Sequence, residues 1–193
     1  MRGYFSGLLA SINKSVNSLD LETFERLVDI AVRVQIEGHK VVVSGLGKNV
    51  PICDKFVGTM LSLGLEASFM HSNTAIHGDL GMVRKGDLVI ILTKSGSTAE
   101  SVLLYDKLKA REVEIWLITF KGDSILGKSV PNVLTLQLEH EGDPWDMMPN
   151  NSTTVYLIIL QALAIKTAEK LGIQLSQFAA NHPGGAIGER LAK

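Results

Sequence analysis

The chain has 193 residues and a formal net charge of -1 at pH 7, and 46% of its residues are hydrophobic. A chain of this length and apolar content can bury one sizeable core, so we expect a single domain over residues 1–193. The balanced charge offers no bulk attraction to nucleic acid or to an anionic membrane. An anionic ligand therefore needs a local binding site.

We expect neither a membrane span nor a disulfide. The longest apolar stretch, residues 155–165, contains Gln161 and is too short to cross a bilayer. Cys53 is the sole cysteine of the sequence, so no intramolecular disulfide can form. A small buried thiol in a reducing compartment is the usual state of such a cysteine, and we expect a cytoplasmic protein.

The order of elements predicts an α/β fold. Residues 1–37 read as a helical segment, with apolar residues at helical spacing over 20–36, and the α/β core follows over 38–193. Strands are expected at 40–45, 66–70, 87–92, 113–119 and 133–138, and further helices at 47–63, 98–111, 124–128 and 152–171. Five short apolar strands separated by helices predict a three-layer αβα sandwich with a five-stranded parallel sheet, doubly wound as in flavodoxin. The glycine-rich residues 181–188 predict a turn.

Residues 94–100, which follow the third strand, are the strongest candidate for a binding site. Small hydroxyl residues around a glycine, at the start of a helix, can present hydroxyls and backbone N–H groups to a phosphate. The expected phosphate contacts are Ser95, Ser97 and Thr98. Glu100 would lie about one helical turn away, within reach of the carbon skeleton of a small phosphorylated substrate. Lys94 either adds charge to this site or points to water, and an ordinary helix cap is the alternative for the loop.

The turn after the first strand is a second candidate. Gly45 and Gly47 let the backbone approach a ligand, and Lys48 adds a positive charge. The spacing is that of neither the dinucleotide fingerprint nor the P-loop, so a solvated loop lysine is equally compatible. We also expect Ser44, in the same strand, to contact the phosphate.

Two histidine-containing stretches follow other strands. His77 beside Asp79 is either a proton carrier oriented by the carboxylate or a loop histidine next to a local turn. After the last strand, Glu139, His140 and Glu141 form a charged run of the kind that is usually solvated. If Glu141 turned instead into a partly desolvated pocket, burial would raise its pKa toward the range useful for proton transfer.

We expect no metal. The five histidines show no paired i, i+4 spacing, and Cys53 has no C-x-x-C partner.

Four stretches together resemble the SIS (sugar isomerase) domain: residues 45–48, 77–82, 95–100 and 182–188. The strings H-G-D-L-G-M and H-P-G-G-A-x-G are the specific ones, and the resemblance extends over about residues 20–192. More narrowly, the chain resembles the arabinose 5-phosphate isomerases, which interconvert D-ribulose 5-phosphate and D-arabinose 5-phosphate for Kdo, and hence lipopolysaccharide, synthesis.

The resemblance implies functional residues and an assembly. The implied active-site residues are Lys48, Glu100, Glu141 (with Glu139 as the register alternative), His77 and His182. It also implies a reaction through a cis-enediol without a cofactor, and a homotetramer whose sites are shared between subunits. In this scheme Glu141 or Glu100 moves the carbon proton, His182 serves ring opening or oxygen protonation, and Lys48 stabilises negative charge.

The sequence departs from the family at three places. No paired CBS domains follow, so we expect no nucleotide sensing through them. Asn49 stands where serine is usual, and residues 149–153 replace a Pro-Thr-Ser-Ser-Thr entry to the last helix. Two alternatives therefore stay open: an isomerase of another phosphosugar, such as a hexulose or heptose phosphate, and a sensor that binds a sugar phosphate without turnover.

Overall fold

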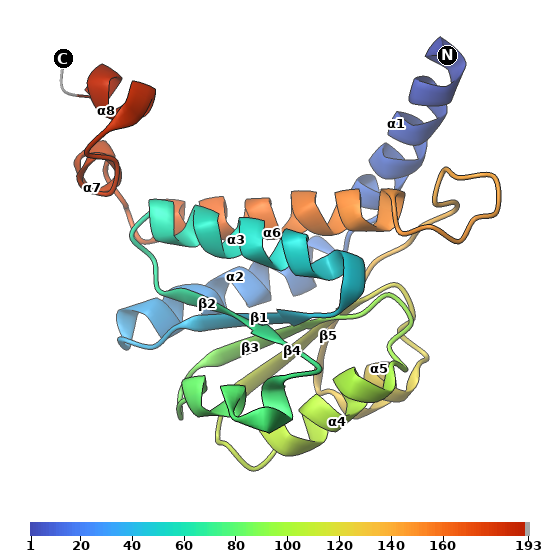
Figure 1. The fold of residues 1–193 in the computed structure, drawn as a ribbon, viewed down its shortest axis with the longest axis horizontal. Coiled ribbons are helices and arrows are strands. Elements are labelled where there is room, and N and C mark those ends of the chain that lie inside the picture. Colours follow the sequence, from blue (N-terminus) through green and yellow to red (C-terminus); the bar gives the residue numbers. More distant parts are fainter. Residues whose placement is uncertain (192–193) are drawn as a thin grey trace.

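The computed structural model describes residues 1–191, in which a sheet lies between two layers of helices (Figure 1). Within this range the sheet has five strands, all parallel, in the order β2-β1-β3-β4-β5. The strands are β1 (Val41–Gly45), β2 (Ala67–His71), β3 (Leu88–Leu92), β4 (Glu114–Thr119) and β5 (Asn132–Thr135). The predicted α/β fold with a five-stranded parallel sheet is confirmed.

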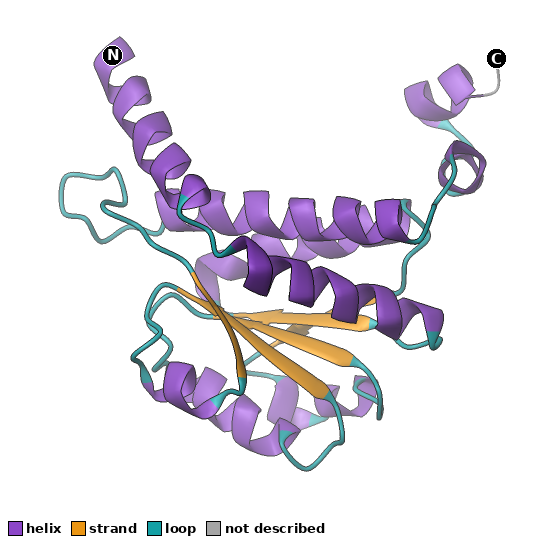
Figure 2. Cartoon of the chain, turned by 180° about the vertical axis from the view of Figure 1, so that it is seen from behind, coloured by secondary structure: helices purple, strands orange, loops and turns teal. Residues whose placement is uncertain are grey.

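Helices cover both faces of the sheet, as Figure 2 shows from behind. One face carries α2 (Leu21–Ile36), α3 (Val50–Ser62) and α6 (Asn151–Lys170), and the other carries α4 (Ala99–Leu108), α5 (Ile125–Ser129) and the short turns η2 (Ala75–His77) and η3 (Asp79–Met82). Alternate residues of β1 enter different cores: Val41 and Val43 pack on the first side, and Val42 on the second. Burial on both faces explains why the strands read as continuous apolar runs.

The strand order creates a crevice at one edge of the sheet. β1 lies between β2 and β3, and the chain leaves β1 toward α3 on one face but leaves β3 toward α4 on the other. This is a topological switch point, where the loops that follow the two strands run to opposite faces of the sheet. Ligands of doubly wound sheets bind in the crevice between these loops.

The predicted elements match the structure within a few residues, with one strand ending early. Asp20 starts α2, and its carboxylate accepts hydrogen bonds from Glu22 N at 3.1 Å and Thr23 N at 3.3 Å. The last predicted strand extends to residue 138, whereas β5 ends at Thr135. β5 is an edge strand that pairs with β4 alone, and Thr135 lies opposite the last residue of β4, Thr119, so the ladder stops there.

The prediction of a turn over residues 181–188 is wrong in its second half. Residues from Gly185 onward form α8 (Gly185–Leu191), preceded by α7 (Leu175–Ala180), which the sequence did not predict. The non-helical connection between α7 and α8 is confined to residues 181–184, and Gly185, the first residue of α8, has a φ of +70°. Gly188 then sits against the His182 carbonyl, where a Cβ would lie 2.7 Å from the oxygen.

Both ends of the chain project from the body. α1 (Arg2–Asn17) rises beyond α6 at one end, and α7 with α8 rises beyond it at the other (Figure 1). The predicted N-terminal helical segment is thus two helices, α1 and α2. None of the helices in residues 1–191 is both long and apolar enough to cross a bilayer.

Candidate active site

A cavity of about 530 Å³ opens at the carboxyl ends of β1 and β3, where the strand order places the crevice. Its walls come from η1 (Gly47–Asn49), the loop after β3, the first turn of α4 and the segment before α6. The lining residues are Leu46, Gly47, Lys48, Asn49, Leu92, Thr93, Lys94, Ser95, Thr98, Ser101, Lys121 and Pro149. Two of the four predicted stretches, those after β1 and β3, therefore meet in one place.

The turn after β1 holds Lys48 on the cavity wall. A Cβ added at Gly45 would lie 3.0 Å from both Asn49 Cβ and Cys53 Sγ, so glycine lets α3 approach the strand closely. Asn49 Nδ2 donates a hydrogen bond of 3.3 Å to the Leu92 carbonyl, which ties the turn to β3. Lys48 itself is exposed, so its ammonium group can reach a ligand in the cavity.

The loop after β3 is folded on itself by hydroxyl groups. The Thr93 hydroxyl accepts a hydrogen bond from Gly96 N at 3.2 Å and lies 3.3 Å from the Thr98 hydroxyl. Ser95 Oγ accepts from Ser97 N at 3.3 Å. Gly96 has a φ of +62°, in the left-handed region that favours glycine. The compact loop leaves the side chains of Ser95 and Ser97 exposed, at the start of a helix.

The first turn of α4 also offers donors to the cavity. Within the described chain the Thr98 side chain makes no capping hydrogen bond to α4, so the first N–H groups of the helix can bind an anion. Ser101, which the sequence analysis missed, lines the cavity although it is only 1% exposed. Its hydroxyl finds no hydrogen-bond partner among residues 1–191. A buried hydroxyl without a partner is costly unless a ligand or water satisfies it.

Lys94 joins the loop to the start of α6. Its Nζ lies 2.5 Å from Oε1 of Glu141, whose side chain is fully buried. The second carboxylate oxygen, Oε2, accepts from the backbone N–H groups of Asn150 at 3.0 Å and Ser152 at 2.9 Å. Glu141 thus anchors the first turn of α6, and it does not line the cavity.

The state of Glu141 differs from both sequence expectations. The side chain is not solvated, and burial acts to raise the pKa of its carboxyl. The hydrogen bonds from Lys94, Ser152 and the Asn150 N–H outweigh burial, so the pKa lies below its ordinary value. The sequence analysis expected a raised pKa if Glu141 were desolvated; the residue is buried, but its pKa is lowered, because the sequence could not show the cation and the N–H groups that face the carboxylate.

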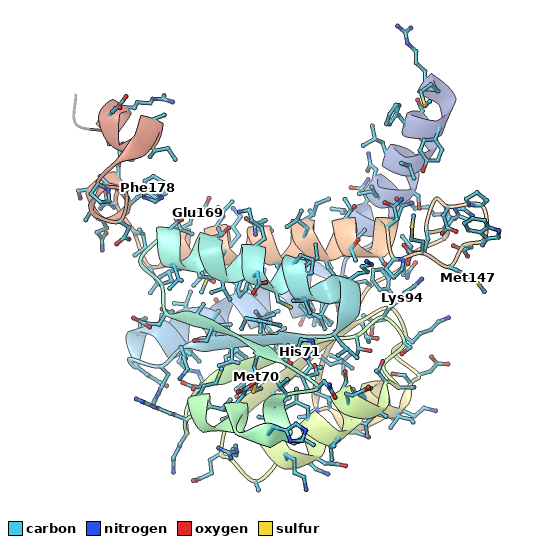
Figure 3. All side chains as sticks on the ribbon, in the orientation of Figure 1. Met70, His71, Lys94, Met147, Glu169 and Phe178 are labelled. Carbon is cyan, nitrogen blue, oxygen red and sulfur yellow. The ribbon has the colours of Figure 1, made fainter. Side chains whose placement is uncertain are left out.

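The segment between β5 and α6 is ordered by Asp143. Its buried carboxylate accepts hydrogen bonds of 3.0 Å from the N–H groups of Trp145, Met147 and Met148. These bonds outweigh burial and keep the pKa of Asp143 below its usual value. The segment positions Pro149 on the cavity wall, and Figure 3 shows Met147 and Lys94 at the same end of the molecule.

The lining of the cavity carries positively charged side chains, one of which, Lys94, is paired with the buried Glu141. Three of the residues that line the cavity are lysines, Lys48, Lys94 and Lys121. Among the described residues that line it there is no aspartate or glutamate. Excess positive charge beside hydroxyl groups and a helix N-terminus suits a phosphate group.

Three other predicted residues lie near the cavity without lining it. Ser97 is exposed in the loop after β3. Glu100 stands in the first turn of α4 and is partly buried. Ser44 is fully buried, and its hydroxyl donates 2.7 Å to the Met70 carbonyl and lies 2.9 Å from the Ser72 hydroxyl. Ser44 therefore holds β1 to the segment after β2, and its hydroxyl does not line the cavity.

His77 is exposed in η2, after the edge strand β2. The carboxylate of the neighbouring Asp79 accepts a hydrogen bond of 2.6 Å from the Thr74 hydroxyl. Of the two alternatives for His77, the local turn is the one that this contact favours. Glu139, the register alternative to Glu141, is exposed and paired with Lys14 of α1.

His182 lies at the opposite end of the molecule. Its ring stacks on Phe178 of α7 with centroids 4.0 Å apart, and Nδ1 lies 2.7 Å from the Phe178 carbonyl oxygen. Figure 3 shows Phe178 at one end of α6 and Lys94 at the other. The 20 residues of α6 correspond to about 30 Å, so one chain does not bring His182 to its own cavity.

No metal site is evident in residues 1–191, where no three His, Cys, Asp or Glu side chains are grouped so that they could hold an ion. Cys53 is fully buried, and burial raises the pKa of its thiol well above the ordinary value. The prediction of a buried cysteine is confirmed.

The fold and the cavity together define a doubly wound α/β domain with a lysine- and hydroxyl-lined cavity at its switch point. The family model of the SIS domain matches residues 36–166. The chain therefore belongs to the SIS domain family, as the sequence motifs predicted.

The curated relatives are isomerases. The chain is 33% identical over 95% of its length to the arabinose 5-phosphate isomerase KdsD of Francisella tularensis, and 40% identical over 79% to that of Pseudomonas aeruginosa. A solved structure from E. coli CFT073, in complex with arabinose 5-phosphate, superposes with a TM-score of 0.87 at 30% identity, over 94% of this chain and 95% of that one. The chain spans about half the length of the two curated relatives, 56% and 47%.

Proposed function

We propose that this protein is a phosphosugar isomerase that interconverts D-ribulose 5-phosphate and D-arabinose 5-phosphate. The observation that supports it most is the cavity, in which three lysines and a hydroxyl-rich helix start converge. The likeness to arabinose 5-phosphate isomerases over 95% of the chain supports a pentose phosphate as substrate. The arabinose 5-phosphate complex of the similar E. coli protein supports the same choice.

Such an isomerisation removes a proton from the carbon next to a carbonyl, passes through a cis-enediol, and returns a proton to the neighbouring carbon. In our proposal the phosphate is bound by Ser95, Ser97, Thr98 and the first N–H groups of α4. Glu100, in the first turn of that helix, is then close enough to the sugar to move the carbon proton, and Glu141 is the alternative base. Lys48 stabilises the charge that develops on the enediolate oxygen. The reaction needs no redox cofactor.

His182 would reach a site only in an assembly. A two-fold axis across the middle of α6 would place a second copy's α7 and α8 beside the start of α6 in the first copy, where the cavity lies. The outer surface between the two projections carries exposed apolar residues that could form this contact: Leu61 is 51% exposed, Ile158 38% and Ile165 48%.

We propose that His182 enters a neighbour's site in this way and acts in ring opening or oxygen protonation. His77 does not line the cavity of its own chain, and the family resemblance alone supports a role for it in a shared site. The family resemblance supports a homotetramer and a role in Kdo synthesis. The free, buried Cys53 fits a reducing cytoplasm, where we propose that the enzyme works.

The proposal is tested by assaying a panel of phosphosugars: arabinose 5-phosphate, ribulose 5-phosphate, and representative hexulose and heptose phosphates. We expect turnover of the pentose pair alone, lost in Lys48→Met and retained in Lys109→Met, a lysine at the end of α4 that is paired with Asp106. Turnover of a hexulose or heptose phosphate instead would reassign the substrate. Binding of the whole panel without turnover would identify a sensor.

A further inference from the structure

Lys94 differs from the other two lysines of the cavity, because a buried carboxylate holds its ammonium group. The Lys94 side chain is 43% exposed, whereas that of Glu141 is 0% exposed. One end of this ion pair therefore faces the cavity and the other end is inside the protein. An ion pair of this kind fixes the position of the exposed partner.

The backbone of Lys94 is held as well. Its carbonyl oxygen accepts hydrogen bonds from the Thr119 hydroxyl at 3.2 Å and from Phe120 N at 3.3 Å, both at the end of β4. The residue directly precedes Ser95, the first hydroxyl of the loop. Both ends of the Lys94 side chain are thus fixed beside the hydroxyl groups, and a side chain that is already ordered loses less entropy when it binds a ligand.

The carboxylate of Glu141 is occupied on both oxygens. Oε1 bonds to Lys94 Nζ, and Oε2 accepts from two backbone N–H groups at the start of α6. The backbone of Glu141 is fixed too, since its N–H donates 2.6 Å to Oδ1 of Asp146. A group with these contacts is well placed to hold a cation and poorly placed to move toward a substrate carbon.

We propose that Lys94 binds the phosphate group of the substrate, and that Glu141 is a positioning residue that holds Lys94 rather than the base that takes the carbon proton. The inference rests on the proposed function and assigns roles within the same site. It leaves Glu100 as the carbon base. The lowered pKa of Glu141 agrees with this assignment, because an efficient base has a pKa closer to the working pH.

The test compares Lys94→Met, Glu141→Gln and the double variant, with Lys109→Met as the matched control. Three quantities are measured: the affinity for inorganic phosphate by calorimetry, KM and kcat for arabinose 5-phosphate, and solvent deuterium exchange into the sugar. Loss of a charge-assisted contact should weaken phosphate binding and raise KM by about tenfold or more in both single variants. We expect kcat to change much less.

Two further results are expected. The double variant should bind phosphate no more weakly than Lys94→Met alone, because the two residues act as a unit. Lys94→Arg should recover part of the affinity, which a general loss of folding would not allow. Lys109→Met should match the unaltered protein in all three measurements.

Two results would overturn the inference: unchanged phosphate affinity in Lys94→Met, or Glu141→Gln that stops deuterium exchange while phosphate affinity stays unchanged. If Glu141→Gln does not fold, the phosphate affinity of Lys94→Met still decides, since that variant removes only the exposed partner. Phosphate affinity needs no turnover. If the protein isomerises no pentose phosphate, yet both single variants lose phosphate binding, the proposed function is contradicted and the inference is supported.

Discussion

Gly96 and Ser124 lie so close together that a Cβ at position 96 would fall 1.9 Å from the Ser124 hydroxyl oxygen. The Ser124 hydroxyl cannot easily move away, because it accepts a hydrogen bond of 3.1 Å from Gly127 N and caps α5. Glycine at position 96 is therefore required by space as well as by its φ of +62°. The close contact sets the path of the loop that we assign to the phosphate.

We predict that Gly96→Ala lowers the free energy of unfolding by at least about 2 kcal/mol and abolishes phosphate binding, because the loop must shift to accommodate the methyl group. Gly58→Ala is the control, since that glycine is in α3 with open space around its Cα. It should leave binding unchanged and leave stability equal or up to about 1 kcal/mol higher. Chemical denaturation and calorimetry measure both effects, and equal behaviour of the two variants would contradict the account.

A second prediction concerns the unpartnered hydroxyl of Ser101. If the ligand satisfies it, Ser101→Ala should weaken arabinose 5-phosphate binding about fivefold, the equivalent of roughly 1 kcal/mol, without loss of stability. Thr167→Val is the matched control: its hydroxyl is likewise buried and has no partner in the described part of the chain, but it lies near the far end of α6. The assignment would be refuted if Thr167→Val bound arabinose 5-phosphate more weakly than the unaltered protein, or if Ser101→Ala bound it equally well.

A third prediction follows from the lowered pKa of Glu141. A carboxyl whose pKa is lower in the folded than in the unfolded state stabilises the fold at pH values above its ordinary pKa of 4.5. This stabilisation is lost as the pH falls through the pKa of the folded state. Glu141→Gln should therefore cost about 1–3 kcal/mol at neutral pH and much less once the pH has fallen below the folded pKa of Glu141.

Urea denaturation across this pH range measures that difference. Glu169→Gln is the control, because Glu169 is exposed and paired only with Lys166 among the described residues. It should show little effect at any pH. A penalty for Glu141→Gln that did not shrink in acid would mean that the ionised form of Glu141 does not stabilise the fold.

A fourth prediction tests the shared site. Lys48→Met and His182→Ala should each be inactive alone, because every site lacks one group. Unfolded together and refolded, the two variants should regain part of the activity, because some sites in mixed assemblies take Lys48 from one chain and His182 from another. Activity assays after refolding, with each variant refolded alone as the control, measure this. No recovery, despite mixed assemblies, would place both residues in one chain's site.

Much of the fold could be predicted from the sequence. The apolar runs of β1 and β3 are buried on both faces, so their composition alone identified them, and the apolar spacing over residues 20–36 identified α2. The end of β5 could not be read in this way, because it depends on where β4 stops. The helix α8 was missed because glycine has a low helix propensity, so the glycine-rich sequence favoured a turn.

Part of the site could be predicted because it follows from the order of the strands. The cavity stretches around Lys48 and Ser95 follow strands of a parallel sheet, so topology brings them together. The ion pair between Lys94 and Glu141 joins residues that are 47 positions apart in the sequence, so no local sequence pattern predicts it. Nor could spacing show that His182 lies a full helix length from the cavity.

The most direct test of the isomerase follows ribulose 5-phosphate by NMR in deuterated buffer with the assembled protein. We predict that arabinose 5-phosphate forms and that deuterium appears at the carbon next to the carbonyl, since the proton moves through an enediol open to exchange with solvent. Saturable binding of ribulose 5-phosphate with neither exchange nor product would contradict it.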